Sequence, residues 1–232
     1  MIKVRKSEER GHFNRGWLET YHTFSFEDYV DRDYTKFRQL RVLNEDFIEP
    51  GQTFPAHPHR DMEILTYVLE GEVEHEDSLG NKTRIRPGEI QRMSAGFGLT
   101  HSERNPSQTD TAHLLQIWIY PNAKSLTPSY EQKSFKEMKR QGTFLLVASS
   151  KGRFGSVALH QEVDVSVALL NPGEQMFYSM LPDRYVWVQM ARGALTLNEV
   201  PLKAGDGAAV SEEETLHFIG KEPAEILLFD LP

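Results

Sequence analysis

The chain has 232 residues, of which 39% are hydrophobic and 26% are charged, and its formal net charge is −8. This composition is typical of a folded globular protein, and the acidic balance disfavours direct binding to nucleic acid, which requires a basic surface. The absence of cysteine excludes disulfides and thiolate ligands, while the charged first ten residues and the lack of a long apolar run predict a cytoplasmic protein without a membrane segment.

Hydrophobic residues recur mainly with period two, in short segments separated by Gly, Pro, Asn and Asp. The clearest segments are residues 40–44, 64–69, 72–75, 114–119 and 186–190. Many short strands with turns between them predict an all-β fold of barrels or jelly rolls with few short helices. The best helix candidate is residues 134–140, closed by Gly142, in a connector over residues 121–142.

The two halves of the chain resemble each other at a nearly constant offset. Residues 48–51 match 170–173 and residues 68–71 match 190–193, both 122 positions apart, and residues 86–89 match 203–206. We therefore predict two copies of one β-unit, with an N-terminal metal-binding domain at 1–132 and a degenerate C-terminal domain at 133–232. At this offset His57 aligns with Ser179 and His59 with Leu181, so the second copy is expected to serve as scaffold.

Two short pairs of residues, His57 with His59 and His101 with Glu103, have the spacing of metal ligands on strands. Residues two apart on a strand share one face and lie about 6 to 7 Å apart, so two neighbouring strands can direct all four side chains to one ion. Another carboxylate, Glu63, lies about 13 Å beyond His59 in an unbroken strand and reaches the ion only if the chain turns. Nitrogen and oxygen ligands suit Fe(II), Mn(II), Ni(II) or Cu(II) and leave coordination positions open.

The surrounding residues resemble the two metal-binding motifs of the cupin superfamily. The stretch that resembles the first motif runs from Gly51 through His57-Pro58-His59 to Glu63, with five residues before the histidine pair and three after it. Residues 88–105 resemble the second motif, but they depart from its usual pattern at Ser94 and in the number of residues before His101. Longer strings resemble the pirin family more closely: HTFSF at 22–26, LRVLN at 40–44, HPHRDME at 57–63 and SAGFGLTHSE at 94–103.

The resemblance to pirins covers about residues 12–120. It implies a bicupin with one mononuclear metal, usually iron, in the N-terminal barrel, and it places the carboxylate ligand at Glu103 rather than Glu63. It also implies quercetin 2,3-dioxygenase activity, which the closest bacterial members are assigned. Other pirin-like proteins are described as transcription cofactors, so the resemblance also supports a regulatory role.

We therefore predict a metal-dependent dioxygenase that cleaves flavonols such as quercetin with O2 and releases CO. The expected metal is one divalent ion per chain, iron(II) first and copper, nickel or manganese as alternatives, with Glu103 both as ligand and as catalytic residue. We expect a small aromatic substrate and a monomer. The residues predicted to surround the ligands or the substrate are Glu63, Met62, Met93, Phe47, Phe54 and Phe97. The alternative is a non-catalytic iron-binding regulatory or redox-sensor protein with a protein partner.

The remaining histidines are predicted to be surface or hydrogen-bonded residues without a metal: His12, His22, His75, His113, His160 and His217. The aromatic residues near the start of the chain, among them Trp17 and Phe26, are predicted to pack in the core, with the lining of a cavity as the alternative.

Overall fold

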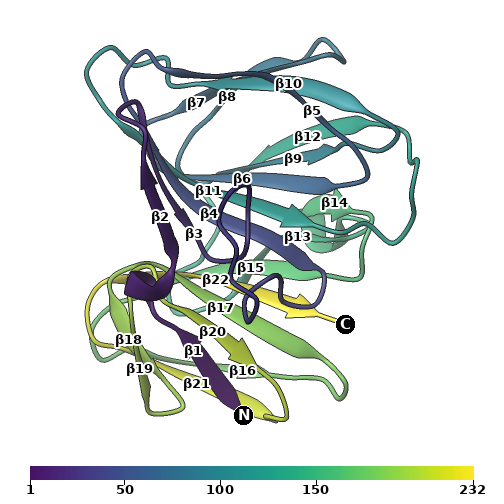
Figure 1. The fold of residues 1–232 in the computed structure, drawn as a ribbon. Helices are drawn as coiled ribbons and strands as arrows, with labels where there is room; N and C mark the ends of the chain where they lie inside the picture. The colour runs from purple at the N-terminus through teal and green to yellow at the C-terminus, as the bar shows by residue number, and fades with distance from the viewer.

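The structure, a computed structural model, describes residues 1–232 and consists almost entirely of β-strands. The N-terminal half forms the upper barrel in Figure 1 and the C-terminal half the lower one. Each barrel is built from one seven-stranded and one four-stranded sheet. The predicted all-β fold with two barrels is confirmed.

The sheets of the N-terminal barrel pair antiparallel throughout. In spatial order the large sheet consists of β12 (Ser129–Ser134), β9 (Glu89–Ser94), β6 (Glu63–Glu70), β11 (Ala112–Ile119), β4 (Leu40–Ile48), β3 (Leu18–His22) and β2 (Gly11–Asn14). The small sheet consists of β5 (Thr53–His59), β10 (Leu99–Arg104), β7 (Val73–Asp77) and β8 (Lys82–Ile85).

The C-terminal barrel has the corresponding pair of sheets. Its large sheet consists of β1 (Ile2–Arg5), β20 (Gly207–Val210), β17 (Tyr185–Arg192), β22 (Ala224–Leu231), β15 (Asp164–Leu170), β13 (Leu145–Ser150) and β14 (Val157–Leu159). Its small sheet consists of β16 (Gln175–Ser179), β21 (Thr215–Gly220), β18 (Ala194–Leu197) and β19 (Val200–Lys203). The only helical segments are two short 3-10 turns, η1 (Ser7–Glu9) and η2 (Arg153–Gly155).

The internal repeat is present in the strand order. In the small sheets, β5, β10, β7 and β8 occupy the same places as β16, β21, β18 and β19. The repeated turns share glycines with positive φ angles, +71° at Gly71 and +68° at Gly193. Only glycine adopts such angles without strain, and a Cβ at Gly193 would also lie 2.0 Å from a backbone oxygen. These turns therefore keep their glycines in both copies.

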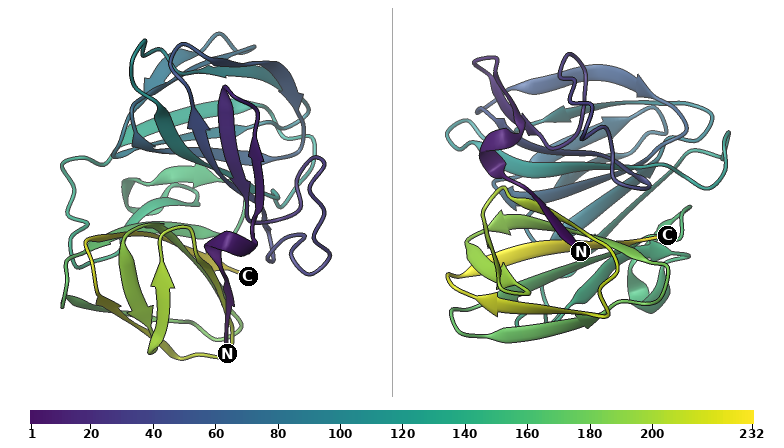
Figure 2. Two further views of the ribbon diagram at one scale, coloured as in Figure 1. Left: turned by 60° about the vertical axis from the view of Figure 1, so that its left-hand side comes forward. Right: turned by 60° about the horizontal axis from the view of Figure 1, so that its bottom comes forward.

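Two strands, β1 near the start of the chain and β12 near its middle, show how the chain passes between the two barrels. β1 leaves the N-terminal barrel and pairs with β20 of the C-terminal one, as the purple strand in Figure 2 shows. β12 spans the predicted boundary after residue 132 and pairs with β9 at the equivalent edge of the other large sheet. The predicted domain limits stay a prediction, but the strand pairing crosses them at both ends.

The predicted helix over residues 134–140 is wrong. Ser134 ends β12, where it pairs with Glu89, and the following residues form turns. Phe135 is buried in the core between the barrels, and its N–H donates to the carbonyl oxygen of Gly88 at 2.8 Å. A helix of seven residues has little stability of its own, so strand pairing and the burial of Phe135 prevail.

The largest apolar core lies between the barrels, where the two large sheets pack against each other (Figure 2). It joins residues such as Leu65 and Ile117 to Val167 and Trp187 of the other barrel. β6 is consequently covered on both faces, which explains its continuous apolar run instead of an alternating one.

The interiors of the two barrels differ. A cluster of 17 buried apolar residues fills the C-terminal barrel. In the N-terminal barrel the apolar interior is divided: along β6, Val68 belongs to one small cluster and Ile64 to another, with Thr66 between them. This middle zone is where polar side chains face the barrel interior.

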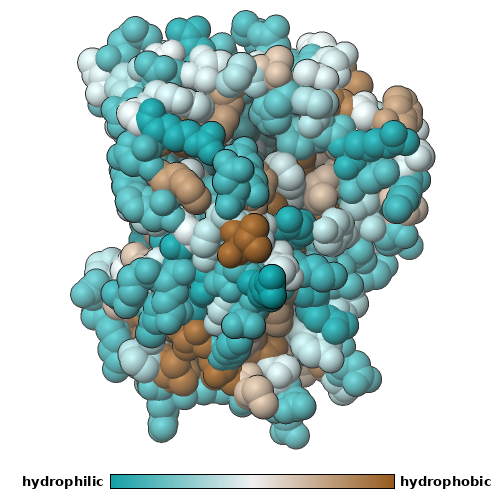
Figure 3. Space-filling view, viewed as in Figure 1, coloured by the Kyte–Doolittle hydropathy of each residue, from teal (hydrophilic) through white to brown (hydrophobic).

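The surface is largely hydrophilic in the view of Figure 3, with apolar residues gathered near the junction of the barrels and over the lower one. None of the helical segments has the length and apolar character that a membrane span requires.

Candidate metal centre

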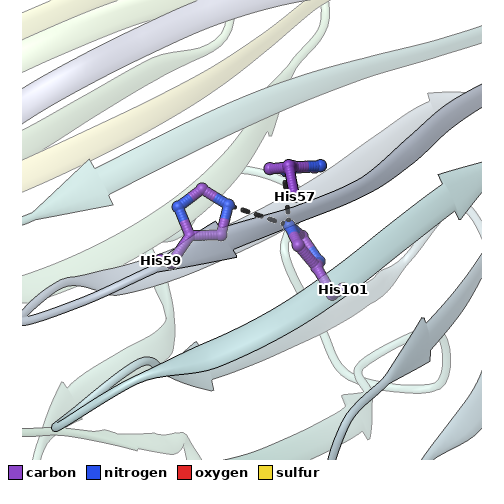
Figure 4. A group of neighbouring side chains, drawn as sticks. All are labelled: His57, His59 and His101. Atoms are coloured by element: carbon purple, nitrogen blue, oxygen red, sulfur yellow. Dashed lines mark hydrogen bonds between the residues drawn. The ribbon is translucent and has the colours of Figure 1, made fainter.

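Three predicted ligands meet across two neighbouring strands. His57 and His59 lie at the end of β5, and His101 lies on β10, directly opposite His57 in the antiparallel register. The Nε2 atom of His101 lies 3.0 Å from Nε2 of His57 and 3.0 Å from Nε2 of His59. Figure 4 shows the three rings converging from the two strands. The i, i+2 spacing on β5 thus brings both of its histidines to one point.

This arrangement fits a metal ion better than it fits hydrogen bonding alone. Each imidazole nitrogen carries at most one proton, so Nε2 of His101 cannot donate fully to both neighbouring nitrogens. Two nitrogens bound at about 2.1 Å and at right angles to each other are separated by about 3.0 Å. The observed separations therefore suit adjacent positions around one transition metal.

Burial keeps these histidines ready to bind a metal. Desolvation, followed by the neighbouring imidazoles, lowers the pKa of His59 to about 3, and the same causes lower the pKa of His101 to about 3. Metal binding requires the unprotonated ring. At neutral pH both rings are therefore neutral, and each can offer one nitrogen lone pair to a metal.

Glu103 lies beside the histidine cluster on β10. The register with β5 shifts between His101 and Glu103, which marks a bulge in the strand. The amide nitrogen of Gln116 donates to both carboxylate oxygens at 2.6 Å, and Thr66 donates at 3.3 Å. Glu103 lines the same cavity as the three histidines, so all four predicted ligands face one space.

His75 was expected to be a surface or hydrogen-bonded residue without a metal, and it is fully buried behind His101. The two Nδ1 atoms of His101 and His75 are 3.3 Å apart, and Nε2 of His75 lies 3.0 Å from Oδ2 of Asp77. The Nε2 atom of Gln91 lies 3.0 Å from Nδ1 of His75. The i, i+2 spacing of His75 and Asp77 on one strand is the sequence signal that could have revealed this contact.

A cavity of about 660 Å³ opens in front of the histidines. Its walls include Trp17, Phe26, Phe54, Met62 and Trp118. The ring of Trp118 stands edge-on to His59 with centroids 4.8 Å apart, and Phe26 stands edge-on to Trp118 at 5.3 Å. Trp17 and Phe26 therefore line the cavity, as the alternative prediction states, while Phe24 from the same stretch is buried in the core as first predicted.

The other predicted pocket residues lie elsewhere. Phe47 stacks on His113 with ring centroids 4.1 Å apart, Met93 is buried in a small apolar cluster, and Phe97 is 59% exposed. Glu63 accepts hydrogen bonds from the backbone and ring of His160 across the junction of the barrels. Of the six predicted residues only Phe54 and Met62 line the cavity, because nearness in sequence does not decide which face of a strand a side chain occupies.

A row of four polar residues crosses the large sheet, and three of them, His22, Asn44 and Gln116, form the floor of the cavity. The strand registers place His22, Asn44, Gln116 and Thr66 side by side on β3, β4, β11 and β6. The equivalent row of the C-terminal barrel, read from its own registers, is Leu146, Ser166, Leu228 and Val188. The fold thus does not require this polar row, and only the barrel with the histidines has it.

The chain matches two known family profiles, that of Pirin over residues 3–119 and that of the quercetinase C-terminal cupin domain over residues 146–231. It is 47% identical over 232 residues to quercetin 2,3-dioxygenase of Escherichia coli strain K12, covering all of this chain and 99% of that protein. It is 38% identical to Pirin-like protein of Caulobacter vibrioides, covering 99% of each chain.

A solved structure has nearly the same backbone. The crystal structure of the bacterial pirin YhhW of Escherichia coli in complex with nickel(II) is similar at a TM-score of 0.95 and 48% identity, covering 100% of this chain and 99% of that one. The fold of two barrels, the spacing of the histidines and the profile matches to both halves of the chain all point to the same family. The chain therefore belongs to the pirin family of the cupin superfamily.

Proposed function

We propose that this pirin is a metal-dependent dioxygenase that cleaves flavonols such as quercetin with O2 and releases CO. The observation that carries the proposal is the convergence of three histidines on a cavity of about 660 Å³ with aromatic walls. A cavity of this size suits a small planar aromatic substrate. The similarity to quercetin 2,3-dioxygenase of Escherichia coli supports the same choice of substrate.

His57, His59 and His101 hold the metal in this proposal, with Glu103 as the fourth ligand. Iron(II) is the proposed ion, and nickel, copper and manganese also suit nitrogen and oxygen ligands. The similar pirin from Escherichia coli was crystallised with nickel(II). A bound divalent metal acts as a Lewis acid and lowers the pKa of a coordinated hydroxyl group.

Glu103 is the proposed base that takes the proton of the flavonol 3-hydroxyl. Gln116 donates to both of its oxygens and Thr66 to one, so the carboxylate is held in a fixed orientation within the cavity. Glu63 is not suited to this role, because it lies outside the cavity and is paired with His160.

The aromatic walls orient the substrate and exclude water. Trp118 and Phe26 pack edge to face in a line that begins at His59, so one wall of the cavity is built of packed rings where it meets the histidines. A planar substrate gains favourable contacts with such rings, and a dry site strengthens the electrostatic interactions within it.

The test is to load the protein with iron, copper, nickel or manganese and to follow bound metal, quercetin loss and CO under air. We expect turnover in the wild type, and a loss of metal and of turnover on the order of 100-fold or more in His59→Ala and Glu103→Ala. His217→Ala is the matched control, because His217 lies on β21 of the other barrel and bonds to Gln175.

Two results contradict parts of the proposal separately. Full metal retention in both His59→Ala and Glu103→Ala contradicts the ligand assignment. A metal-loaded wild type that leaves quercetin intact contradicts the dioxygenase and favours the regulatory alternative, which recovery of a stoichiometric protein partner would then support.

A further inference from the structure

Four polar residues form a square on two adjacent strands of the cavity floor. His22 pairs with Asn44 and Thr20 with Asp46 across β3 and β4. Because the pairs are two residues apart on each strand, the side chains share one face, about 5 Å apart across the strands and about 7 Å along them. All four residues are buried, and all four line the cavity.

The square lies directly beside the proposed metal centre. Asn44 is opposite Gln116 on β11, and Gln116 holds both oxygens of Glu103. One strand spacing of about 5 Å therefore separates Asn44 from the residue that orients the proposed ligand. A molecule held at the histidines can reach the square along the floor of the same cavity.

The square has unused hydrogen-bonding capacity. Oδ1 of Asn44 and Nδ1 of His22 are buried without a partner, and the side chains of these two residues make no hydrogen bond to the protein. Thr20 is the only hydrogen-bond partner of Asp46, at 2.5 Å. Buried polar groups are normally paired, so partners from outside the chain are expected.

The C-terminal barrel shows that these polar residues are not needed to fold the barrel. Its registers place Leu146 at the position of His22, Ser166 at that of Asn44 and Ala168 at that of Asp46. Two of the three positions are apolar there, and Ala168 belongs to the apolar cluster that fills that barrel. The polar square occurs only beside the histidines.

We propose that His22, Asn44 and Asp46 form a subsite that binds the hydroxyl groups of a second ring of the substrate, away from the metal. The proposal rests on the proposed function, because it takes the first hydroxyl of the substrate to lie at the histidines. The amide oxygen of Asn44 and the carboxyl group of Asp46 accept hydrogen bonds, which suits phenolic hydroxyls.

The test compares two flavonols that share the 3-hydroxyl group. Quercetin carries hydroxyls on its outer rings and 3-hydroxyflavone carries none, so their affinities isolate the outer hydroxyls. The wild type, Asn44→Leu and His22→Leu are each loaded with nickel and titrated with each flavonol in the absence of O2, and the dissociation constants are compared. Ser166→Ala is the matched control, because it changes the position equivalent to Asn44 in the other barrel.

We expect the wild type to bind quercetin about tenfold or more tightly than 3-hydroxyflavone. Each leucine variant should lower that preference at least about threefold, through weaker binding of quercetin alone. The melting temperature of Asn44→Leu and His22→Leu should equal or exceed that of the wild type, because each substitution removes a buried polar group that has no hydrogen-bond partner. Ser166→Ala should keep the wild-type preference.

Equal affinity of the wild type for the two flavonols, or an unchanged preference in both leucine variants, overturns the subsite. Turnover under air separates this result from a failure of the proposed function. A preference for quercetin without CO release leaves the subsite standing while the dioxygenase fails. CO release from both flavonols at equal kcat/KM leaves the dioxygenase standing while the subsite fails.

Discussion

His101 is held from behind by a buried chain of side chains. A metal at Nε2 of His101 leaves a proton on its Nδ1, which faces Nδ1 of His75, and Nε2 of His75 in turn faces Asp77. Such outer contacts fix the orientation of a ligating imidazole and raise its basicity. We infer that His75 positions His101 for metal binding.

Replacing His75 tests this role. His75→Phe keeps a ring stacked near Tyr130, at centroids now 5.1 Å apart, and removes the contacts of the imidazole with His101, Asp77 and Gln91. We expect metal affinity to fall roughly 10-fold to 100-fold, measured by competition with a chelator of known affinity. His217→Ala should keep the wild-type affinity, and an unchanged affinity in His75→Phe would remove His75 from the site.

Asp46 gives the protein a measurable pH dependence. Burial, together with nearby carboxylates, raises the pKa of Asp46 from 3.8 to about 7 although Thr20 opposes the shift. Between these values the folded chain keeps a proton that the unfolded chain releases, so this group makes stability fall as pH rises from about 4 to 7. The loss is complete above the folded-state pKa.

The neutral isostere Asp46→Asn removes this proton uptake while leaving an oxygen that can accept from Thr20. From pH 5 to pH 8, the metal-free wild type should lose about 2 to 3 kcal/mol of unfolding free energy relative to the variant. Urea unfolding at the two pH values measures this difference. Parallel pH profiles for the two proteins would mean that Asp46 is ionised throughout this range.

At the scale of elements, β1 and β12 take equivalent edge positions in opposite barrels. β1 supplies the edge partner of β20, and Val4 on it packs against the apolar interior of the C-terminal barrel. β12 supplies the edge partner of β9 in the barrel that holds the histidines. Residues 6–128, between these two strands, therefore follow a strand of the C-terminal barrel and precede a strand of the N-terminal barrel.

Removal of residues 1–5 should destabilise the C-terminal barrel selectively. β20 would lose one of its two neighbouring strands and keep its pairing with β17, so its amides should exchange with solvent faster, while the strands that hold the histidines keep their partners. Hydrogen exchange read by mass spectrometry, with metal affinity measured alongside, checks both points. Faster exchange in β5 and β10 to the same extent would show that the barrels unfold together.

At the scale of the whole molecule, one strand order serves two purposes. The two large sheets share one apolar core between the barrels, and the C-terminal barrel fills its interior with apolar side chains. The N-terminal barrel leaves its middle zone polar and hollow, with the histidine cluster on the small sheet and the polar row on the large one. The C-terminal barrel thus covers one face of a large sheet whose other face lines the cavity.

Local sequence patterns were sufficient to predict the repeat and the convergence of the three histidines. His57 and His59 share a face because side chains on a strand alternate, and the repeated glycines mark turns that need positive φ in both copies. The helix at 134–140 failed because a short local propensity competes with strand pairing and with the burial of Phe135.

The surroundings of the histidines could not be predicted from local spacing. Three features depend on registers between different strands: the contact of His75 with His101, the hydrogen bonds from Gln116 to Glu103, and the polar square on β3 and β4. Those registers follow from the burial of whole sheet faces, which no local spacing records. Spacing along one strand was therefore enough to predict that His57 and His59 share a face, because it involves neighbours in sequence. The cavity in front of them follows from packing between strands that are distant in sequence.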